Sequence, residues 1–261
     1  MHFDLTDQYR ARPSAIHHLD PRVRVVVAVL FILTCSLIPI GAWRGFAALL
    51  ALVVAASAVA QLGATFTLRR SYIALPFALV AVPLLFTVPG EVLYTVPGLG
   101  WTVTAQGLER FLSVLLRSWI AVQAAILLTA VTRFPDLLWA LGALRLPRSL
   151  VSTIGFMYRY LFVLSDEAAR MLRARAARAS SPPGSRRPGV LWQARVAGNM
   201  VGSLFLRALE RSERVHAAMI ARGYNGAMPS LTAHALRLAD WALGVLVILL
   251  LAGILAIAYR S

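Results

Sequence analysis

A strongly basic stretch, residues 160–226, constrains this chain more than any other feature. It is too polar to cross a lipid bilayer, yet strongly apolar runs flank it on both sides. Prolines and glycines at 182–189 divide it, because proline interrupts a helix and glycine favours a turn. The pattern predicts two long helices outside the bilayer. The first includes residues 166–179, and the second runs from about Leu191 to Arg222 and ends at Gly223, a typical C-terminal cap.

The second of these helices is predicted to have two different faces. Arg207, Arg211 and Arg214 recur at three- and four-residue steps on one side. Apolar and small residues recur at the same steps on another side: Val201, Leu204, Ala208, Ser212, Val215 and Met219. Small residues between long arginines let a helix approach another surface closely. That surface could be anionic lipid, nucleic acid, an acidic protein groove or simply solvent.

The rest of the chain has the composition of an integral membrane protein. Of its 261 residues, 59% are hydrophobic and only 14% are charged, whereas soluble domains average about 25% charged residues. The net charge is +15, and every basic residue is arginine. In a chain with membrane-length apolar runs, arginines mark the cytoplasmic side and contact anionic lipids, which argues against a nucleic-acid partner. The single cysteine, Cys35, excludes a disulfide within one chain, and no cleavable signal peptide is expected.

Five apolar runs are each close to the length that crosses a bilayer. They are residues 23–40, 45–62, 72–88, 108–131 and 241–259. Asp20 and Pro21 are typical of the N-cap and the first position of a helix. Pro76 and Pro83 in the third run predict kinks that neighbouring helices support. A loop rich in glycine and proline follows at 89–100.

The distribution of arginine predicts the topology. Fifteen of the 26 arginines lie between Arg133 and Arg222, so this block and the N-terminus are expected in the cytoplasm. Residues 146–164 are apolar but carry arginines and tyrosines. We expect them to form an amphipathic helix at the membrane interface, and a sixth span is the alternative.

The predicted fold class is therefore an all-α integral membrane protein with about five transmembrane helices. Residues 1–132 hold four of them, residues 133–236 form a cytoplasmic domain of long amphipathic helices, and residues 237–261 hold the last.

Little in the sequence points to catalysis. It contains no G-x-x-x-x-G-K-[ST] phosphate loop and no H-E-x-x-H motif. Acidic residues are nearly absent from the apolar runs, so a proton relay has little to use. His17 and His18 beside Asp20 could suggest a metal site, but two adjacent histidines without further ligands are more often structural. No metal site and no cofactor are predicted.

One charge within an apolar run is costly. Arg117 could pair with Glu109 or Glu91, or extend its guanidinium outward, and we expect a structural role for it.

Several segments resemble the T components of energy-coupling factor (ECF) transporters, in particular the CbiQ branch. Residues 211–226, which contain Ala221-Arg222-Gly223, are similar to the second Ala-Arg-Gly box of that family. Residues 19–24 (Leu-Asp-Pro-Arg-Val-Arg) resemble the family's N-terminal start, and residues 128–141, followed by Leu146-Pro147-Arg148, resemble its central part. The resemblance extends over nearly the whole chain.

The first box departs from the family pattern. It reads Ala177-Arg178-Ala179, with alanine where the family often has glycine. The arginine and its small neighbours remain, but alanine adopts a left-handed cap less readily than glycine.

The resemblance implies a non-catalytic scaffold in the bacterial inner membrane. Each box would seat in a groove of one of two ABC-type ATPase subunits, with Arg178 and Arg222 as anchors. ATP-driven closure would then move a separate, CbiM-like substrate-binding membrane subunit for cobalt or nickel. There are three alternatives: a T component for another micronutrient such as a vitamin, a self-contained permease, and an intramembrane enzyme. A permease or an enzyme would need polar residues within the apolar runs, and these runs are nearly bare of them.

Overall fold

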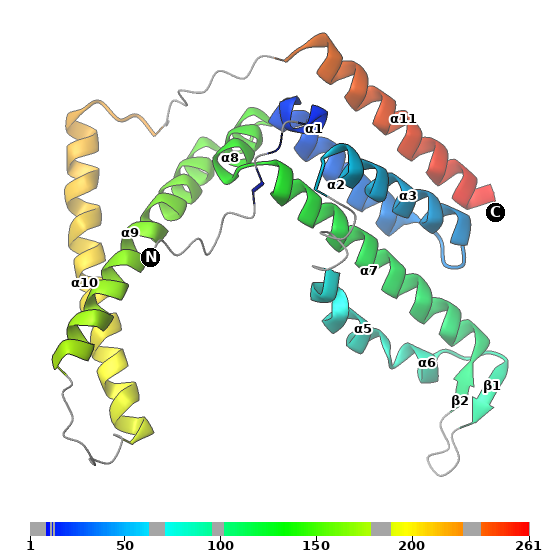
Figure 1. Cartoon of the computed structure of the whole chain (residues 1–261), viewed down its shortest axis with the longest axis horizontal. Helices are drawn as coiled ribbons and strands as arrows, with labels where there is room; N and C mark the ends of the chain where they lie inside the picture. Colours follow the sequence, from blue (N-terminus) through cyan, green and yellow to red (C-terminus); the bar gives the residue numbers. More distant parts are fainter. Residues whose placement is uncertain are drawn as a thin grey trace. The chain divides into compact units, whose positions relative to one another are not determined.

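The computed structural model describes residues 9–10, 12, 14–62, 71–95, 102–178, 189–226 and 236–260, and they are mostly helical. The chain divides into two compact units, residues 1–144 with 232–261 and residues 145–231. The first unit contains α1 (Ala15–His18), α2 (Pro21–Leu37), α3 (Trp43–Val59), η1 (Ser71–Ala74), α5 (Leu75–Ala81), α6 (Leu84–Thr87), β1 (Val92–Thr95), β2 (Thr102–Thr104), α7 (Ala105–Val131), α8 (Phe134–Ala143) and α11 (Leu238–Arg260). The second contains α9 (Arg148–Arg178) and α10 (Val190–Ala221) (Figure 1).

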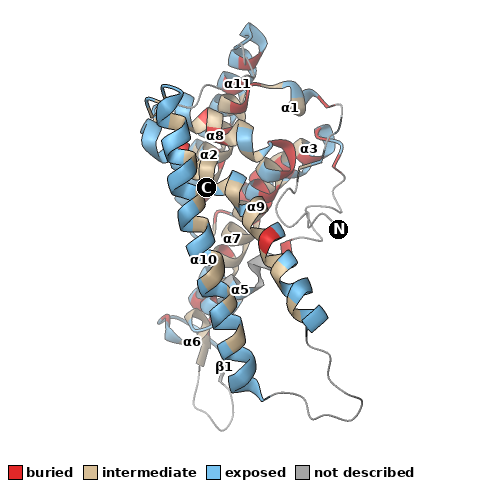
Figure 2. Ribbon diagram, turned by 90° about the vertical axis from the view of Figure 1, so that its left-hand side faces the viewer, coloured by how far each residue is buried: buried red, intermediate tan, exposed pale blue. Residues whose placement is uncertain are grey.

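The core of the first unit lies where α2, α3, α7 and α11 pack together. Buried side chains concentrate in this bundle, whereas α10 is exposed along most of its length (Figure 2). The main cluster comprises Phe31, Cys35, Ile38, Ala42, Phe46, Leu49, Val53, Ile120, Ala124, Leu251 and Ala258.

Contacts at the helix ends define the directions of the four bundle helices. Arg24, near the start of α2, donates a hydrogen bond to the carbonyl of Val131 at the end of α7 (2.8 Å). Tyr259, near the end of α11, donates from its hydroxyl to the carbonyl of Leu37 at the end of α2 (3.2 Å). Gly45, in the first turn of α3, faces Ala258. Helices α2 and α11 therefore run in one direction and α3 and α7 in the other. These directions agree with the predicted topology of five spans that starts from a cytoplasmic N-terminus. Which side of the membrane each helix end faces stays a prediction.

The predicted start of α2 is confirmed. Asp20 is the N-cap, its side chain accepts a hydrogen bond from the amide of Arg22 (2.8 Å), and Pro21 occupies the first helical position. The start of α11 uses a similar arrangement, because Asp240 accepts from the amide of Arg237 (3.0 Å). Both carboxylates are buried and satisfy N–H groups that have no partner within the helix.

Two helices in the described part of the chain, α7 and α11, are long and apolar enough to cross a membrane. Helices α2 and α3 follow the first two predicted runs but have 17 residues each, at the lower limit for a span. The structure thus supports a helical membrane protein, and the count of five spans stays a prediction.

The third run is not the single kinked helix that its sequence predicts. It is divided into η1, α5 and α6, with a turn at Val82 and Pro83. Proline has no N–H, and its ring clashes with the carbonyl four residues earlier, here that of Leu79. The amides of Val82 and Leu85 instead bond to carbonyls three residues back, at 3.3 Å and 3.1 Å. Pro83 therefore ends one helix and begins another.

The loop expected at 89–100 also forms regular structure in its described part. Strands β1 and β2 pair in antiparallel fashion, with an irregularity between Val92 and Tyr94. Thr104 then caps α7 by accepting from the amide of Gly107 (3.0 Å). This small two-stranded sheet is a departure from a purely α-helical fold.

Arg117 has a structural partner that the sequence did not suggest. Its guanidinium donates to the carbonyl of Ile38 (2.5 Å), the C-cap residue of α2. Its ion pairing with Glu109 or Glu91 is not observed among the described residues. The end of a helix carries unpaired carbonyls and partial negative charge, so an arginine is stabilised there.

Candidate functional site

Helices α9 and α10 run in opposite directions and cross each other at an angle (Figure 1). At one end, Ser152 on α9 donates to the carbonyl of Gly226 (3.0 Å), and the rings of Phe156 and Tyr224 meet edge to face with centroids 6.3 Å apart. At the other end, the guanidinium of Arg175 lies 5.9 Å from the ring centroid of Trp192, near the start of α10. These contacts join the two basic helices into one hairpin.

An ion cluster holds the middle of this hairpin. Glu167 on α9 is 8% exposed, and its two carboxylate oxygens accept from Arg207 (3.3 Å) and Arg211 (3.1 Å) on α10. The two arginines are one helical turn apart, so they approach the carboxylate from the same face of α10. A buried carboxylate needs such partners because an unpaired charge would be costly.

Sequence reasoning missed Glu167. It also separated residues 146–164 from residues 166–179, whereas Arg148–Arg178 form one continuous helix, α9. A periodic signal was present: the side of α9 turned toward α10 recurs at three- and four-residue steps. Ser152, Phe156, Glu167 and Arg175 make these contacts, and Tyr160, Val163 and Met171, which are half-buried, continue the same spacing. Helix α9 is not among the described helices that are long and apolar enough to cross a membrane.

The predicted faces of α10 are partly correct. Leu204, Ala208, Val215 and Met219 are half-buried as expected. Val201 is 66% exposed and Ser212 is also exposed, which differs from the prediction. Arg211 lies on the inward side, because Glu167 pairs with it.

The first arginine box lies at the end of α9. Ala177 and Arg178 are exposed, and Arg178 is the last residue of the helix. Ala179 lies outside the described residues. Because its neighbours in the sequence are small, the exposed Arg178 side chain is accessible to another surface.

The second box forms the end of α10, and its predicted glycine cap is confirmed. Ala221 ends the helix, and Arg222 is the C-cap residue. Gly223 has φ +81°, a left-handed conformation that favours glycine. The amide of Gly223 bonds to the carbonyl of Ile220 (2.9 Å), and that of Tyr224 bonds to Met219 (3.0 Å). This pattern is a Schellman cap, and it leaves Arg222 exposed.

Because the hairpin is antiparallel, the two boxes lie at its opposite ends (Figure 1). Trp192 of α10 lies beside Arg175, close to the end of α9. From Trp192 to Arg222 the chain has about 30 residues, which corresponds to about 45 Å at the rise of an α-helix. The hairpin can therefore present one exposed arginine to each of two well-separated surfaces.

Two segments that carry the family resemblance, 19–24 and 128–141, meet in the first unit. Arg24 donates to the carbonyls of Leu19 (2.7 Å) and Val131 (2.8 Å). Arg22 lies over the ring of Trp139, 4.4 Å from its centroid. Arg24 thus caps the end of α7 and ties it to the N-terminal segment.

Of the two histidines considered as metal ligands, His17 has a structural role. His17 hydrogen-bonds through Nδ1 to the hydroxyl of Ser14 (2.6 Å) and through Nε2 to the carbonyl of Arg10 (3.0 Å). Burial, opposed by the Arg10 hydrogen bond and reinforced by nearby Arg24 and His18, lowers the pKa of His17 below its usual value. With both ring nitrogens engaged, His17 is not arranged as a ligand.

Taken together, an apolar helical bundle with membrane-length helices and a basic helical hairpin define a multi-helix membrane protein. The family model described as cobalt transport protein, CbiQ, matches residues 13–234. The chain therefore belongs to the CbiQ family.

Individual relatives agree with this assignment. The cobalt transport protein CbiQ of Rhodobacter capsulatus is 29% identical over 174 residues, which are 65% of this chain and 68% of that protein. The energy-coupling factor transporter transmembrane protein EcfT of Brevibacillus brevis is 28% identical over 237 residues, 84% of each chain. A putative fused cobalt transport protein CbiMQ of Methanocorpusculum labreanum is 28% identical over 152 residues, 57% of this chain and 24% of that protein.

Proposed function

We propose that this chain is the membrane scaffold and coupling subunit of an ATP-driven ECF-type importer for cobalt or nickel. Two ABC-type ATPase subunits hydrolyse ATP, a separate CbiM-like membrane subunit binds the metal ion, and this non-catalytic chain connects them. Family membership and the names of the EcfT and CbiMQ relatives support the transporter class. We place the protein in the inner membrane with a cytoplasmic N-terminus, in contact with anionic lipids through its arginines.

The observation that carries the proposed coupling role is the geometry of the hairpin. Arg178 and Arg222 are exposed at its opposite ends, and a Glu167 ion cluster holds its middle. A pair of helices clasped in this way transmits force between its ends. In the proposed complex, one ATPase receives Ala177, Arg178 and Ala179, and the other receives Ala221, Arg222 and Gly223. A guanidinium is suited to this role because its planar fork binds carboxylates and helix-end carbonyls.

The proposal is tested by co-purification with the ATPase subunits. Arg178→Ala and Arg222→Ala should each weaken ATPase retention, and the double variant should abolish metal uptake in cells. Arg173→Ala and Arg214→Ala are matched controls, because both arginines are exposed on the same two helices but lie outside the boxes. Retention of both ATPases by the double variant at the native level would refute the assigned anchors.

A T component for another micronutrient is the second candidate, since some relatives bear the name EcfT alone. Uptake assays with cobalt, nickel and vitamins, in cells that express each candidate substrate-binding subunit, separate the two. The purified chain alone should neither bind cobalt tightly nor transport it; solute movement by the chain alone would favour a self-contained permease.

A further inference from the structure

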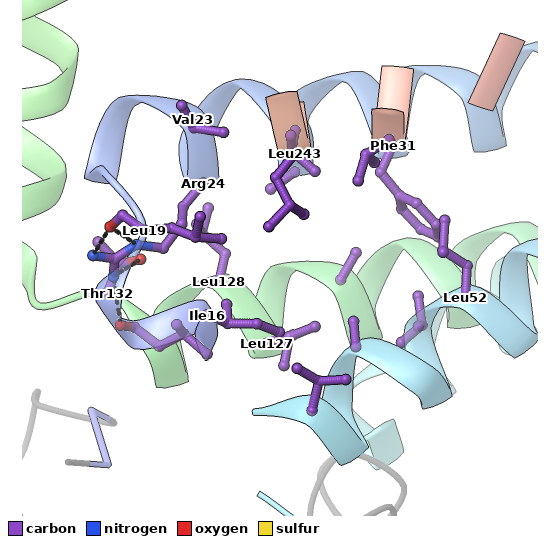
Figure 3. Close-up of a pocket in the computed structure, with 18 of the residues that line it drawn as sticks. Ile16, Leu19, Val23, Arg24, Phe31, Leu52, Leu127, Leu128, Thr132 and Leu243 are labelled. Atoms are coloured by element: carbon purple, nitrogen blue, oxygen red, sulfur yellow. Dashed lines mark hydrogen bonds between the residues drawn. The ribbon is translucent and has the colours of Figure 1, made fainter. Parts of the chain in front are cut away.

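An apolar pocket of about 360 Å³ lies inside the first unit, bounded by α1, α2, α3, α7 and α11. Its walls include Ile16, Phe31, Leu52, Leu127 and Leu243, and it is only partly enclosed. Figure 3 shows Arg24 and Thr132 together at one end, with Phe31 and Leu52 toward the other.

The pocket exists because small side chains meet from different helices. Ala28 on α2, Ala56 on α3 and Ala124 on α7 all line it, whereas Phe46, Leu49 and Ile120 fill the neighbouring core. An empty space of this size deprives the surrounding side chains of dispersion contacts. Within a bilayer, the molecules available to fill it are largely hydrocarbon.

The lining shows which chemistry the pocket accepts. Arg24 and Thr132 are its polar side chains. Arg24 directs its guanidinium to the carbonyls of His17, Leu19 and Val131 and to the hydroxyl of Thr132. These donors are thus engaged within the protein, and the interior offers apolar contact to an occupant. A hydrocarbon chain meets that requirement.

An exposed positive charge lies beside the polar end of the pocket. Arg133, which follows the lining residue Thr132, is exposed, and its guanidinium lies over the ring of Tyr9, 4.7 Å from the centroid. Stacking of this kind leaves the N–H edge of a guanidinium available to an anion. The carboxylates of Asp20 and Asp240 at this end are buried and engaged as helix caps. The half-buried carboxylate of Asp136, in the first turn of α8, is close enough to Arg24 to interact with it. Arg133 remains an exposed charge at this end, and its sign favours a negatively charged headgroup.

We propose that this pocket binds one acyl chain of an anionic phospholipid, with the phosphate beside Arg133 at the arginine-bearing end. The lipid fills the space left by the small residues and contacts α2, α3, α7 and α11. The proposal rests on the membrane location within the proposed function, but not on the coupling role of α9 and α10.

Native mass spectrometry of the full chain in detergent tests the site, with dioleoyl phosphatidylglycerol and dioleoyl phosphatidylcholine as probes. We expect one phosphatidylglycerol per chain to survive release from the micelle, at a lower lipid concentration than phosphatidylcholine requires. Ala56→Trp fills the pocket and should lower retention of both lipids about tenfold. Ala58→Trp is the matched control, because Ala58 is exposed on the same helix and does not line the pocket.

Arg133→Gln tests the headgroup separately. It should reduce the preference for phosphatidylglycerol roughly fivefold, the effect of one basic residue near an anionic surface, and leave phosphatidylcholine retention unchanged. Equal retention by Ala56→Trp and the native chain, equal loss in Ala58→Trp, or equal binding of the two lipids would overturn the proposal.

Cross-linking of the unaltered chain provides a second measurement that needs no variant to fold. Vesicles containing phosphatidylglycerol with a photoreactive group in its acyl chain should label Leu52 and Leu127. Labelling confined to exposed α11 residues such as Leu246 and Leu249 would contradict the site. Cross-links from the substrate-binding subunit to Leu52 or Leu127, without lipid labelling there, would identify a protein interface instead. Retention of the ATPase subunits by Arg178→Ala and Arg222→Ala is measured independently of lipid binding. The proposed coupling role and the proposed lipid site can therefore each fail without the other.

Discussion

Glu167 of α9 accepts a hydrogen bond from Arg211 of α10 at 3.1 Å, across the middle of the antiparallel hairpin. Arg207 binds the other carboxylate oxygen at 3.3 Å. Several arginines follow one another along α10, and Glu167 pairs with two of them, Arg207 and Arg211. This choice fixes the register of α9 against α10. It holds the two arginine boxes at a defined separation.

Glu167→Gln should loosen this register. The amide is neutral and leaves two arginines without their anion, at a cost of about 1 to 3 kcal/mol for a partly exposed cluster. Limited proteolysis and hydrogen exchange should show faster opening of α9 and α10. Glu210→Gln, at an exposed position of α10, should behave like the native protein. Unchanged exchange in Glu167→Gln would show that the cluster does not hold the hairpin.

Gly223→Ala should destabilise the end of α10 by about 1 kcal/mol, because φ at this position is +81° and alanine is strained there. A Cβ at this position would meet no atom within 4 Å, so the effect is conformational and not steric. Gly202→Ala tests the reverse: it is also uncrowded but lies inside the helix, where alanine should stabilise by roughly 0.5 to 1 kcal/mol. Helix content on heating distinguishes the two.

Arg24→Met should lower the thermal stability of the first unit. It leaves the part-buried carbonyls at the ends of α1 and α7 without these donors, at a cost of about 1 to 3 kcal/mol where the carbonyl is not rehydrated. Arg44→Met removes one exposed charge from α3 and should change the melting temperature little. Equal melting of the two variants would show that the Arg24 contacts contribute no stability.

His17 should make the N-terminal segment less stable in mild acid. Its pKa is lowered in the folded protein, mainly by burial, so the unfolded chain takes up a proton at higher pH than the folded chain does. The contribution of neutral His17 is therefore complete above its ordinary pKa of about 6.5 and is lost as pH falls below it. Hydrogen exchange of residues 14–19 between about pH 7.5 and 5 measures this effect. His17→Gln should flatten the dependence, whereas His18→Gln should retain it.

The predicted topology can be tested with a single reporter thiol. Cys35 is the sole cysteine, so Cys35→Ala with Ser185→Cys has one labelling site, between α9 and α10. An impermeant maleimide should react in inverted membrane vesicles and not in intact cells. Reaction in intact cells would place the hairpin outside and reverse the orientation.

The sequence alone indicated much of the local structure. Asp20 and Pro21 predict the start of α2, and Gly223 predicts the end of α10, because these residues act through their own backbone or the next few residues. The family resemblance was also accessible, since its motifs are contiguous in the chain. The break at Pro83 and the strands at 92–95 and 102–104 were missed because competing turn and pairing options have similar local signals.

What only the tertiary structure decided are contacts between residues distant in sequence. Glu167 finds its arginines 40 and 44 residues away, Arg24 caps α7 from 107 residues away, and Arg117 caps α2 in place of an acidic partner. Periodicity tells which face of a helix is inward, but it does not tell which helix meets that face or at what register. Those choices depend on the packing of all the helices at once, and they decide where the apolar pocket forms and how far apart the two arginine boxes lie.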